Sequence, residues 1–293
     1  MTAIPFCKFH GFGNDYIVFE RDAARNAQLP QLAIAMCNRN TGVGADGIAV
    51  LVRIPTSRDK DWVPEIADAD YFCEIVNPDG SVAGFSGNGT RCAVAYLHFK
   101  ELWSEKQLRL ATRSGIKTYN LLEKIGDREF WFDAEIGEPK FASNDIPAIT
   151  DSRRDVVVNE PIDVGGQHYN YSAINVGNPV ACIFVDDFDF DWRTVGREME
   201  THEVFPERAN IVFVKVIDKE NIEIRIWERG AGETAASGTC ASGAAVLSAF
   251  LLKTKRSVNV HSVGGVTKVV WRDDQRIVIT GSATLAFCGE WAV

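Results

Sequence analysis

The chain has 293 residues, of which 46% are hydrophobic and 24% charged, a balance typical of a globular protein and not of a disordered one. Its 31 Lys and Arg against 40 Asp and Glu give a formal charge of −9, which disfavours a nucleic-acid partner because phosphate binding needs a concentrated basic surface. No apolar run reaches the length of a membrane span, and the first residues lack a signal-peptide pattern. We therefore expect a cytoplasmic protein without a membrane partner, long enough for one large or two ordinary domains.

The cysteines and histidines indicate neither a disulfide framework nor a metal site. Seven cysteines at wide spacing, without a C-x-x-C pair, predict buried free thiols in a reducing compartment. The five histidines are scattered and form no H-E-x-x-H pattern, so we expect no metal.

Apolar or alternating runs bounded by Gly, Asn and Pro predict strands, and two Gly-rich loops lead into Ala-rich segments that predict helices beginning at the glycines. The polar, Pro-bearing stretch 53–70 predicts a loop insertion, and 141–163 a connector with surface loops. In chain order, the expected elements are strands 48–52 and 72–76, helix 90–99, strands 116–122, 129–134, 211–216 and 222–227, helix 241–252, and strands 257–261, 267–271 and 276–280.

A weak internal repeat is the most informative feature of the chain. The same 164 residues separate Asn14 from Asn178 and Asp46 from Asn210. A second block, which includes Ser86-Gly87-Asn88 and Ser237-Gly238-Thr239, repeats with an offset of 151. Ordered echoes with matched internal spacing predict two homologous halves facing each other. The fold class is therefore α+β, with mostly antiparallel strands around a helix in each half.

The two Gly-containing loops are candidate anion sites. A strand, a tight turn and a helix N-terminus bring several backbone N–H groups to one point, with the positive end of the helix dipole behind them. The loops around Ser86 and Ser237 both have this pattern, and two such helix ends facing each other would suit one carboxylate. Either loop taken alone is better explained as a plain cap before a core helix, and it is the occurrence of two such loops in symmetric positions that favours an anion site.

Polar residues at corresponding points of the repeat suggest a zwitterionic ligand. Asn77 in one half matches Glu228 in the other, and Arg229 follows directly. Amides and a carboxylate suit an ammonium group, and a guanidinium suits a carboxylate. Single asparagines are common in turns, so it is the repeated placement that favours binding.

Seven ordered motifs spanning nearly the whole chain resemble the diaminopimelate epimerases. They are Lys8-Phe9-His10-Gly11-Phe12-Gly13-Asn14-Asp15, Gly42-Val43-Gly44-Ala45-Asp46, Asn77-Pro78-Asp79-Gly80-Ser81, Gly87-Asn88-Gly89-Thr90-Arg91-Cys92, Gly177-Asn178-Pro179, Phe205-Pro206-Glu207-Arg208-Ala209-Asn210 and Trp227-Glu228-Arg229-Gly230-Ala231-Gly232-Glu233-Thr234.

The resemblance implies a cofactor-independent amino-acid epimerase, an isomerase that inverts the α-carbon of diaminopimelate from LL to meso in lysine and peptidoglycan precursor biosynthesis. It implies two pseudo-symmetric lobes, 1–130 with 281–293 returning to it and 131–280, with the active-site cleft between them. A thiolate on one face of the substrate and a thiol on the other would move the α-proton. A small-molecule amino acid is the expected partner, and a homodimer is one possibility. By position, the implied substrate contacts are Asn14, Gly47, Asn77, Gly87, Asn88, Asn178, Asn210, Glu228, Arg229, Gly238 and Thr239.

The chain departs from the family pattern at the two catalytic positions, where Ser86 and Ser237 stand in place of the family's cysteines. Cysteine has a reference pKa of about 8.5, whereas a hydroxyl resembles water at about 15.7, so forming an alkoxide costs at most roughly 10 kcal/mol more. This energy cost exceeds the usual contribution of general acid–base catalysis, a rate factor of about 10²–10⁴ that corresponds to roughly 3–5 kcal/mol. Two smaller departures, Val180 for a common His and Gly47 for an occasional Gln, would alter substrate preference.

Three explanations for the serines stay open at this stage. They are engineered replacements of cysteine, or native groups that are assisted or replaced by another base, or marks of an amino-acid-binding relative that is catalytically silent. A racemase or isomerase of another small amino acid is the alternative enzyme. Cys92 and Cys240, on the flanking helices, are expected to be core residues and not substitute catalysts.

Overall fold

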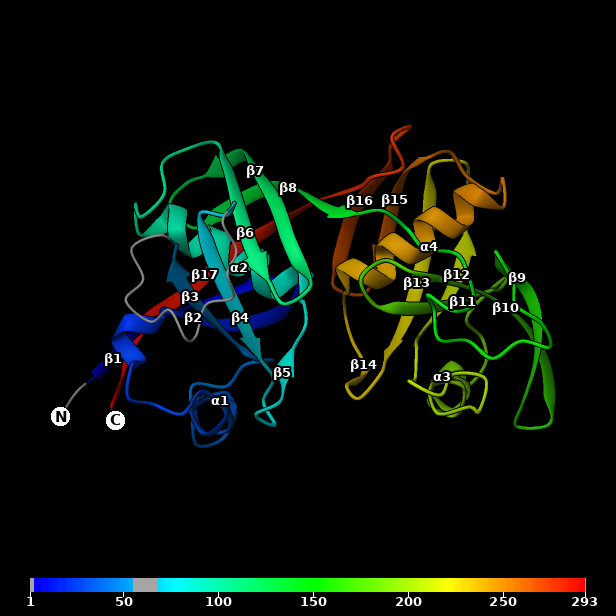
Figure 1. Cartoon of the computed structure of the whole chain (residues 1–293), viewed down its shortest axis with the longest axis horizontal. Coiled ribbons are helices and arrows are strands. Elements are labelled where there is room, and N and C mark those ends of the chain that lie inside the picture. The colour runs from blue at the N-terminus through cyan, green and yellow to red at the C-terminus, as the bar shows by residue number, and fades with distance from the viewer. Residues whose placement is uncertain (1–2, 55–67, 293) are drawn as a thin grey trace. The chain divides into compact units, whose positions relative to one another are not determined.

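The structure is a computed structural model that describes residues 3–54 and 68–292. Its α-helices are α1 (Leu29–Cys37), α2 (Gly87–Phe99), α3 (Trp192–Glu200) and α4 (Gly238–Phe250), with a 3-10 turn at Arg21–Ala24 (Figure 1). The strands are β1 (Ala3–Gly11), β2 (Asn14–Glu20), β3 (Ile48–Arg53), β4 (Tyr71–Val76), β5 (Val82–Ala83), β6 (Gln107–Thr112), β7 (Gly115–Ile125), β8 (Glu129–Gly137), β9 (Val157–Val164), β10 (Gln167–Asn175), β11 (Pro179–Phe184), β12 (Asn210–Val216), β13 (Asn221–Glu228), β14 (Gly232–Glu233), β15 (Ser257–Ser262), β16 (Gly265–Trp271) and β17 (Ile277–Ala292).

The elements predicted from the sequence are confirmed, with ends that shift by a few residues, except that the strand predicted over 276–280 continues as β17 to Ala292. Both predicted helices begin at their glycines, three residues earlier than the Ala-rich pattern indicates. The prediction of a connector over 141–163 is wrong in part, because β9 begins inside it and pairs with β10. Most of the predicted loop insertion at 53–70 lies outside the described residues.

The chain divides into two compact units, the first formed by Met1–Ala134 with Gly281–Val293 and the second by Glu135–Thr280. In the first unit β1 and β2 form an antiparallel hairpin, β2 runs parallel to β3, and β4 is antiparallel to β3 and parallel to β6. The pairings β6–β7, β1–β17 and β17–β8 continue this sheet, which closes as a barrel. Helix α2 packs against β1, β2, β3 and β4.

The second unit repeats the same order of pairings. β10 and β11 form the hairpin, β11 runs parallel to β12, and β13 is antiparallel to β12 and parallel to β15, which pairs with β16. Helix α4 packs against β10, β11, β12 and β13 as well as β15 and β16. The fold is thus rich in sheet, with four α-helices among the described residues.

The composition of α2 and α4 explains why both helices are buried. Every residue from Gly238 to Ala249 is buried, and so is every residue from Gly87 to Leu97. A helix covered on all sides carries mostly small or apolar side chains around its circumference, as the Ala, Gly, Ser and Cys of α4 show. In α2 the buried polar residues Asn88 and Arg91 are hydrogen-bonded. Burial of both helices to their first turn places the residues of their N-terminal loops at fixed positions.

The prediction that the cysteines are all free is wrong for one pair. Cys7 on β1 and Cys288 on β17 stand directly opposite each other in the antiparallel register and form a disulfide, with their Cα atoms 4.0 Å apart. The other five cysteines are free and buried. The bond joins positions 281 residues apart, so no local spacing in the sequence reveals it.

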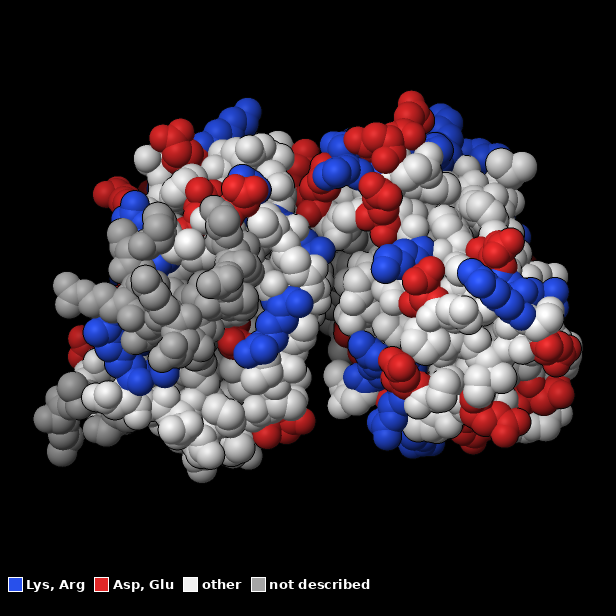
Figure 2. Space-filling view, in the orientation of Figure 1, with Lys and Arg blue, Asp and Glu red and all other residues white. Residues whose placement is uncertain are grey.

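No helix in the described part of the chain has both the length and the apolar character of a membrane span. On the face shown in Figure 2, acidic and basic side chains are interspersed over each unit.

Candidate active site

Ser86 is the N-cap of helix α2 and lies at the end of the Gly-rich loop of the first unit. Its backbone is extended (φ −134°), and its Oγ accepts a hydrogen bond from the N–H of Gly89 at 3.1 Å. Its carbonyl accepts the N–H of Thr90 at 2.9 Å. A serine in this conformation satisfies one of the otherwise unpaired donors of the first turn, which is why the helix starts here.

The hydroxyl of Ser86 has a second partner that the sequence analysis missed. The phenol of Tyr16, on β2, lies 2.8 Å from Ser86 Oγ and shares a hydrogen bond with it. Tyr16 is buried, with 6% of its surface exposed. The sequence offered a signal in the Gly-Asn-Asp-Tyr segment, since Tyr16 follows the predicted contact Asn14 by two residues.

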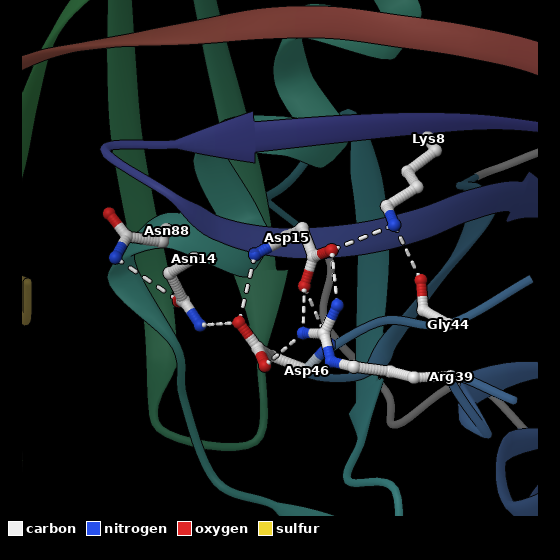
Figure 3. A network of polar contacts seen from close by, with 7 residues as sticks. All are labelled: Lys8, Asn14, Asp15, Arg39, Gly44, Asp46 and Asn88. Carbon is white, nitrogen blue, oxygen red and sulfur yellow. Dashed lines mark hydrogen bonds and ion pairs between the residues drawn. The ribbon is translucent and has the colours of Figure 1, made fainter. Parts of the chain in front are cut away.

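Asn14 and Asn88, both predicted contacts, lie in one directed chain of hydrogen bonds (Figure 3). Arg91 donates from Nη1 to Asn88 Oδ1 at 3.3 Å, Asn88 Nδ2 donates to Asn14 Oδ1 at 3.1 Å, and Asn14 Nδ2 donates to Asp46 Oδ2 at 2.7 Å. A cation at one end and a carboxylate at the other fix which way both amides point.

Arg91 is a buried cation with 1% of its surface exposed. Its Nη1 donates to the carbonyl of Ser282 on β17 at 3.4 Å as well as to Asn88, and its guanidinium lies 5.7 Å from the centre of the Phe12 ring. Burial lowers the pKa of Arg91. The contacts tie α2 to the β1–β2 hairpin and to the last strand of the same unit.

An ion-pair network surrounds Asp46, at the carboxylate end of the series of hydrogen bonds through Asn88 and Asn14 (Figure 3). Asp15 accepts from Lys8 at 2.8 Å and from Arg39 at 2.8 and 3.1 Å, while Arg39 also reaches Asp46 at 2.7 Å. Burial raises the pKa of Asp15, but the hydrogen bonds from Arg39 and Lys8 outweigh it and lower the pKa to about 2. Asp15 is therefore a carboxylate at neutral pH.

The second unit builds its own polar cluster at the corresponding strand ends. Asn210 Oδ1 accepts the backbone N–H of Arg229 at 3.0 Å, and the Arg229 guanidinium donates to Asn178 Oδ1 at 3.1 Å. The neighbouring Glu228 accepts the hydroxyl of Thr234 at 2.9 Å. The structure thus brings three of the predicted contacts, Asn178, Asn210 and Arg229, into direct hydrogen-bond contact.

Ser237 is the N-cap of α4, as Ser86 is of α2, but its hydroxyl has longer contacts. Its Oγ lies 3.5 Å from the N–H of Cys240 and 3.4 Å from Thr239 Oγ1. Gly238 and Thr239 form the buried first turn behind it. The first turns of both helices therefore present backbone N–H groups, which favour a negatively charged ligand group.

Three predicted contacts of the first unit, Asn77, Gly47 and Gly87, lie outside the hydrogen-bonded chain that contains Asn14 and Asn88. Asn77 follows β4 and donates to Ser81 Oγ at 2.9 Å inside its own turn. Gly47 lies just before β3 and leaves room for the Tyr16 ring, because a Cβ there would stand 2.8 Å from Tyr16 Cε1. Gly87 begins α2 and is buried.

Cys92 and Cys240 are fully buried free thiols, as the sequence analysis expected. Burial raises the pKa of Cys92 to about 12 and the pKa of Cys240 well above its ordinary value. A thiol that resists ionisation in this way makes a poor base or nucleophile.

Comparisons with known proteins agree with the resemblance. A family model described as diaminopimelate epimerase matches residues 6–140 and 172–286. A diaminopimelate epimerase of Pelotomaculum thermopropionicum is 36% identical over 289 residues, covering 98% of each chain. One from Caldanaerobacter subterraneus is 37% identical over 286 residues, covering 97% of this chain and 98% of that one.

Solved structures share the fold at low identity. A probable proline racemase from Agrobacterium radiobacter K84 matches with a TM-score of 0.70 at 13% identity, over 99% of this chain and 93% of that one. A phenazine biosynthesis protein of the PhzF family from Bacillus anthracis matches with a TM-score of 0.66 at 17% identity over the whole of both chains. At these identities the match concerns the fold alone.

Proposed function

The chain belongs to the diaminopimelate epimerase family, and from that premise we propose that it is an isomerase that interconverts LL- and meso-diaminopimelate. The observation that carries the proposal is the doubled site. In each unit a β-hairpin and a parallel pair of strands pack against a buried helix that begins at a serine cap, and asparagines of the family motifs lie at the ends of these strands.

In this proposal the two units are pseudo-symmetric lobes, each wrapped around its helix α2 or α4, that act on one substrate molecule. Ser86 and Ser237 are the two acid/base groups. One takes the α-proton from the substrate while the other supplies a proton to the opposite face, which inverts the carbon. No cofactor takes part in this scheme.

The remaining contacts divide by charge. Backbone N–H groups of the first turns of α2 and α4, which begin at Gly87 and Gly238, suit the carboxylate at the reacting carbon, and stabilise the negative charge that develops when its proton leaves. Arg229 suits a second carboxylate, and Glu228 an ammonium group. We propose the same contact set for the substrate as the motifs imply: Asn14, Gly47, Asn77, Gly87, Asn88, Asn178, Asn210, Glu228, Arg229, Gly238 and Thr239.

An isotope experiment tests the function. The protein is incubated with LL-diaminopimelate in D₂O, deuterium at the α-carbon is followed by NMR, and the stereoisomers are separated by chiral chromatography. We expect measurable but slow exchange in the parent chain and faster exchange in the Ser86→Cys/Ser237→Cys variant, because a thiol ionises far more readily than a hydroxyl.

The Ser86→Ala/Ser237→Ala variant is the matched control, since it nearly keeps the size of both side chains and removes both hydroxyls. Exchange in this control equal to that of the parent would remove the serines from the mechanism. Exchange in the cysteine variant alone would mean that the family's binding geometry is kept and the chemistry lost. Silence in both, with no stabilisation by the ligand, would rule out diaminopimelate as the substrate.

A further inference from the structure

The hydroxyl of Ser86 has two fixed partners in the first unit. It accepts the N–H of Gly89 at 3.1 Å, and it shares a hydrogen bond of 2.8 Å with the phenol of Tyr16. We infer that Tyr16 is the proton acceptor and donor behind Ser86, so that the serine transfers protons without becoming a free alkoxide. The inference rests on the proposed function, which assigns Ser86 the role of an acid/base group.

The position of the phenol is tightly constrained. A Cβ added at Gly47 would lie 2.8 Å from Tyr16 Cε1, and one added at Gly89 would lie 2.9 Å from the same atom. Two glycines from different parts of the chain thus contact the Tyr16 ring. A buried ring packed this closely keeps its hydroxyl at Ser86, which is the preorganisation that proton transfer requires.

The acidities of the two hydroxyl groups favour a role for Tyr16 as the group that holds the proton and for Ser86 as the group that transfers it. A phenol has a reference pKa of about 10, whereas an aliphatic hydroxyl resembles water at about 15.7. As base, the Tyr16 phenolate takes the Ser86 hydroxyl proton while Ser86 Oγ takes the α-proton, which leaves a phenol, a serine hydroxyl and the substrate carbanion. As acid, Ser86 returns its proton to the carbanion and Tyr16 reprotonates the serine. Tyr16 acts through Ser86 and is therefore a positioning residue that also stores the proton.

The second unit lacks the corresponding phenol. By the 164-residue repeat, Tyr16 corresponds to Val180, which is fully buried and packs against Gly243. The hydroxyl of Ser237 has Thr239 Oγ1 at 3.4 Å and the N–H of Cys240 at 3.5 Å. Because an isopropyl group offers no proton, the relay assigns efficient proton removal to one serine and one face of the substrate.

Tyr16→Phe tests the relay, since it removes the phenolic oxygen and keeps the packed ring. We expect the exchange rate at saturating substrate to fall by roughly 10²–10⁴-fold, with KM nearly unchanged, because the lost group acts on the proton and not on binding. In the parent, the rate should rise with pH as the phenol ionises, and the variant should lose that rise. Tyr171→Phe, which removes a buried phenol in the other unit, is the matched control and should change neither rate nor profile.

Two further readouts separate a relay from a merely structural role. In a Ser86→Cys background, Tyr16→Phe should have a far smaller effect, because a thiol ionises without the phenol. In the parent, one of the two stereoisomers should take up deuterium at the α-carbon with retention of configuration faster than it is inverted. Tyr16→Phe should lower the rate of deuterium uptake by that stereoisomer more than the rate of uptake by the other one.

Each outcome bears on one proposal or the other. An active parent whose rate, pH profile and isomer preference survive Tyr16→Phe overturns the relay alone. An equal loss in the serine and cysteine backgrounds also overturns it, since it would show a packing effect. A parent without any exchange overturns the proposed function of the Ser/Ser chain, and the relay falls with it.

Discussion

Asp15 is the carboxylate on which the network behind Asn14 and Asp46 depends, and Asp15→Asn is the sharpest test of that network. The substitution keeps the shape of the side chain and removes its charge. It leaves Lys8 with the Gly44 carbonyl and Arg39 with Asp46, and both cations lose the buried carboxylate that now accepts their hydrogen bonds. We expect a less stable first unit and slower exchange at the proposed active site, because Asp46 loses the carboxylate that accepts its N–H and Asn14 depends on Asp46 for its own hydrogen bond.

The magnitude follows from the pKa of Asp15. Its pKa of about 2, against an ordinary value of 3.8, corresponds to roughly 2 kcal/mol of stability at neutral pH. Because the folded-state pKa is the lower one, this stability is complete above the ordinary pKa and is lost as pH falls through about 2. We take the figure from Asp15, whose side chain is 11% exposed, and not from Arg39, whose side chain is 56% exposed and screened by solvent.

Urea unfolding at pH 7, 4 and 3 measures the effect. The free energy of unfolding of Asp15→Asn should lie roughly 2 kcal/mol below the parent at pH 7, and the gap should narrow to about half by pH 3. Asp22→Asn is the control, since that carboxylate is exposed and pairs with Arg25 at the surface. A gap that stays the same at every pH would refute the electrostatic reasoning and point to packing.

Two other changes probe the same unit. Gly47→Ala should destabilise the fold by about 1–3 kcal/mol and slow isotope exchange, because its Cβ would lie 2.8 Å from Tyr16 Cε1 and 3.0 Å from the Val76 carbonyl oxygen. Thermal melting measures the change in stability, and the D₂O assay measures the exchange rate. An unchanged melting temperature would mean that the Tyr16 ring can move away without cost. Reducing the Cys7–Cys288 bond, which spans 281 residues, should lower the free energy of unfolding by at most roughly 5 kcal/mol. Cys288→Ser should match the reduced parent in urea melts, and a parent insensitive to reductant would show that the thiols are not joined.

The helices that carry Ser86 and Ser237 could be predicted because their signals are local. A Gly-rich turn, a cap residue and a run of small residues follow one another within about fifteen positions in each half. The internal repeat adds long-range information, since it marks positions such as Asn14 and Asn178 as equivalent although they lie far apart in the chain. Local patterns and a repeat together are enough to locate the candidate site in the sequence.

The network around Asp15 could not be predicted in the same way. Arg39 lies in the polar loop after α1, and only the parallel pairing of β2 with β3 brings that loop beside Asp15. The Cys7–Cys288 bond likewise depends on the register of β1 with β17. Both the Arg39–Asp15 contact and the Cys7–Cys288 bond depend on how distant strands pair, and no local sequence pattern around these residues indicates that pairing.

The repeat that made the site predictable also shows where the halves differ in a way that affects the chemistry. Equivalent groups in the two units, such as the two serine caps, offer the same kind of contact, but inversion of a carbon needs one group that accepts a proton and another that releases it. At one repeated position the first unit has the phenol of Tyr16, which lies at Ser86, and the second has the isopropyl group of Val180, which packs against Gly243 of α4. In the proposed mechanism only Ser86 has a more acidic neighbour, the phenol of Tyr16. When Ser237 alone is changed to alanine, we therefore expect isotope exchange on the Ser86 face to continue after inversion is lost. When Ser86 alone is changed to alanine, we expect no such residual exchange on that face.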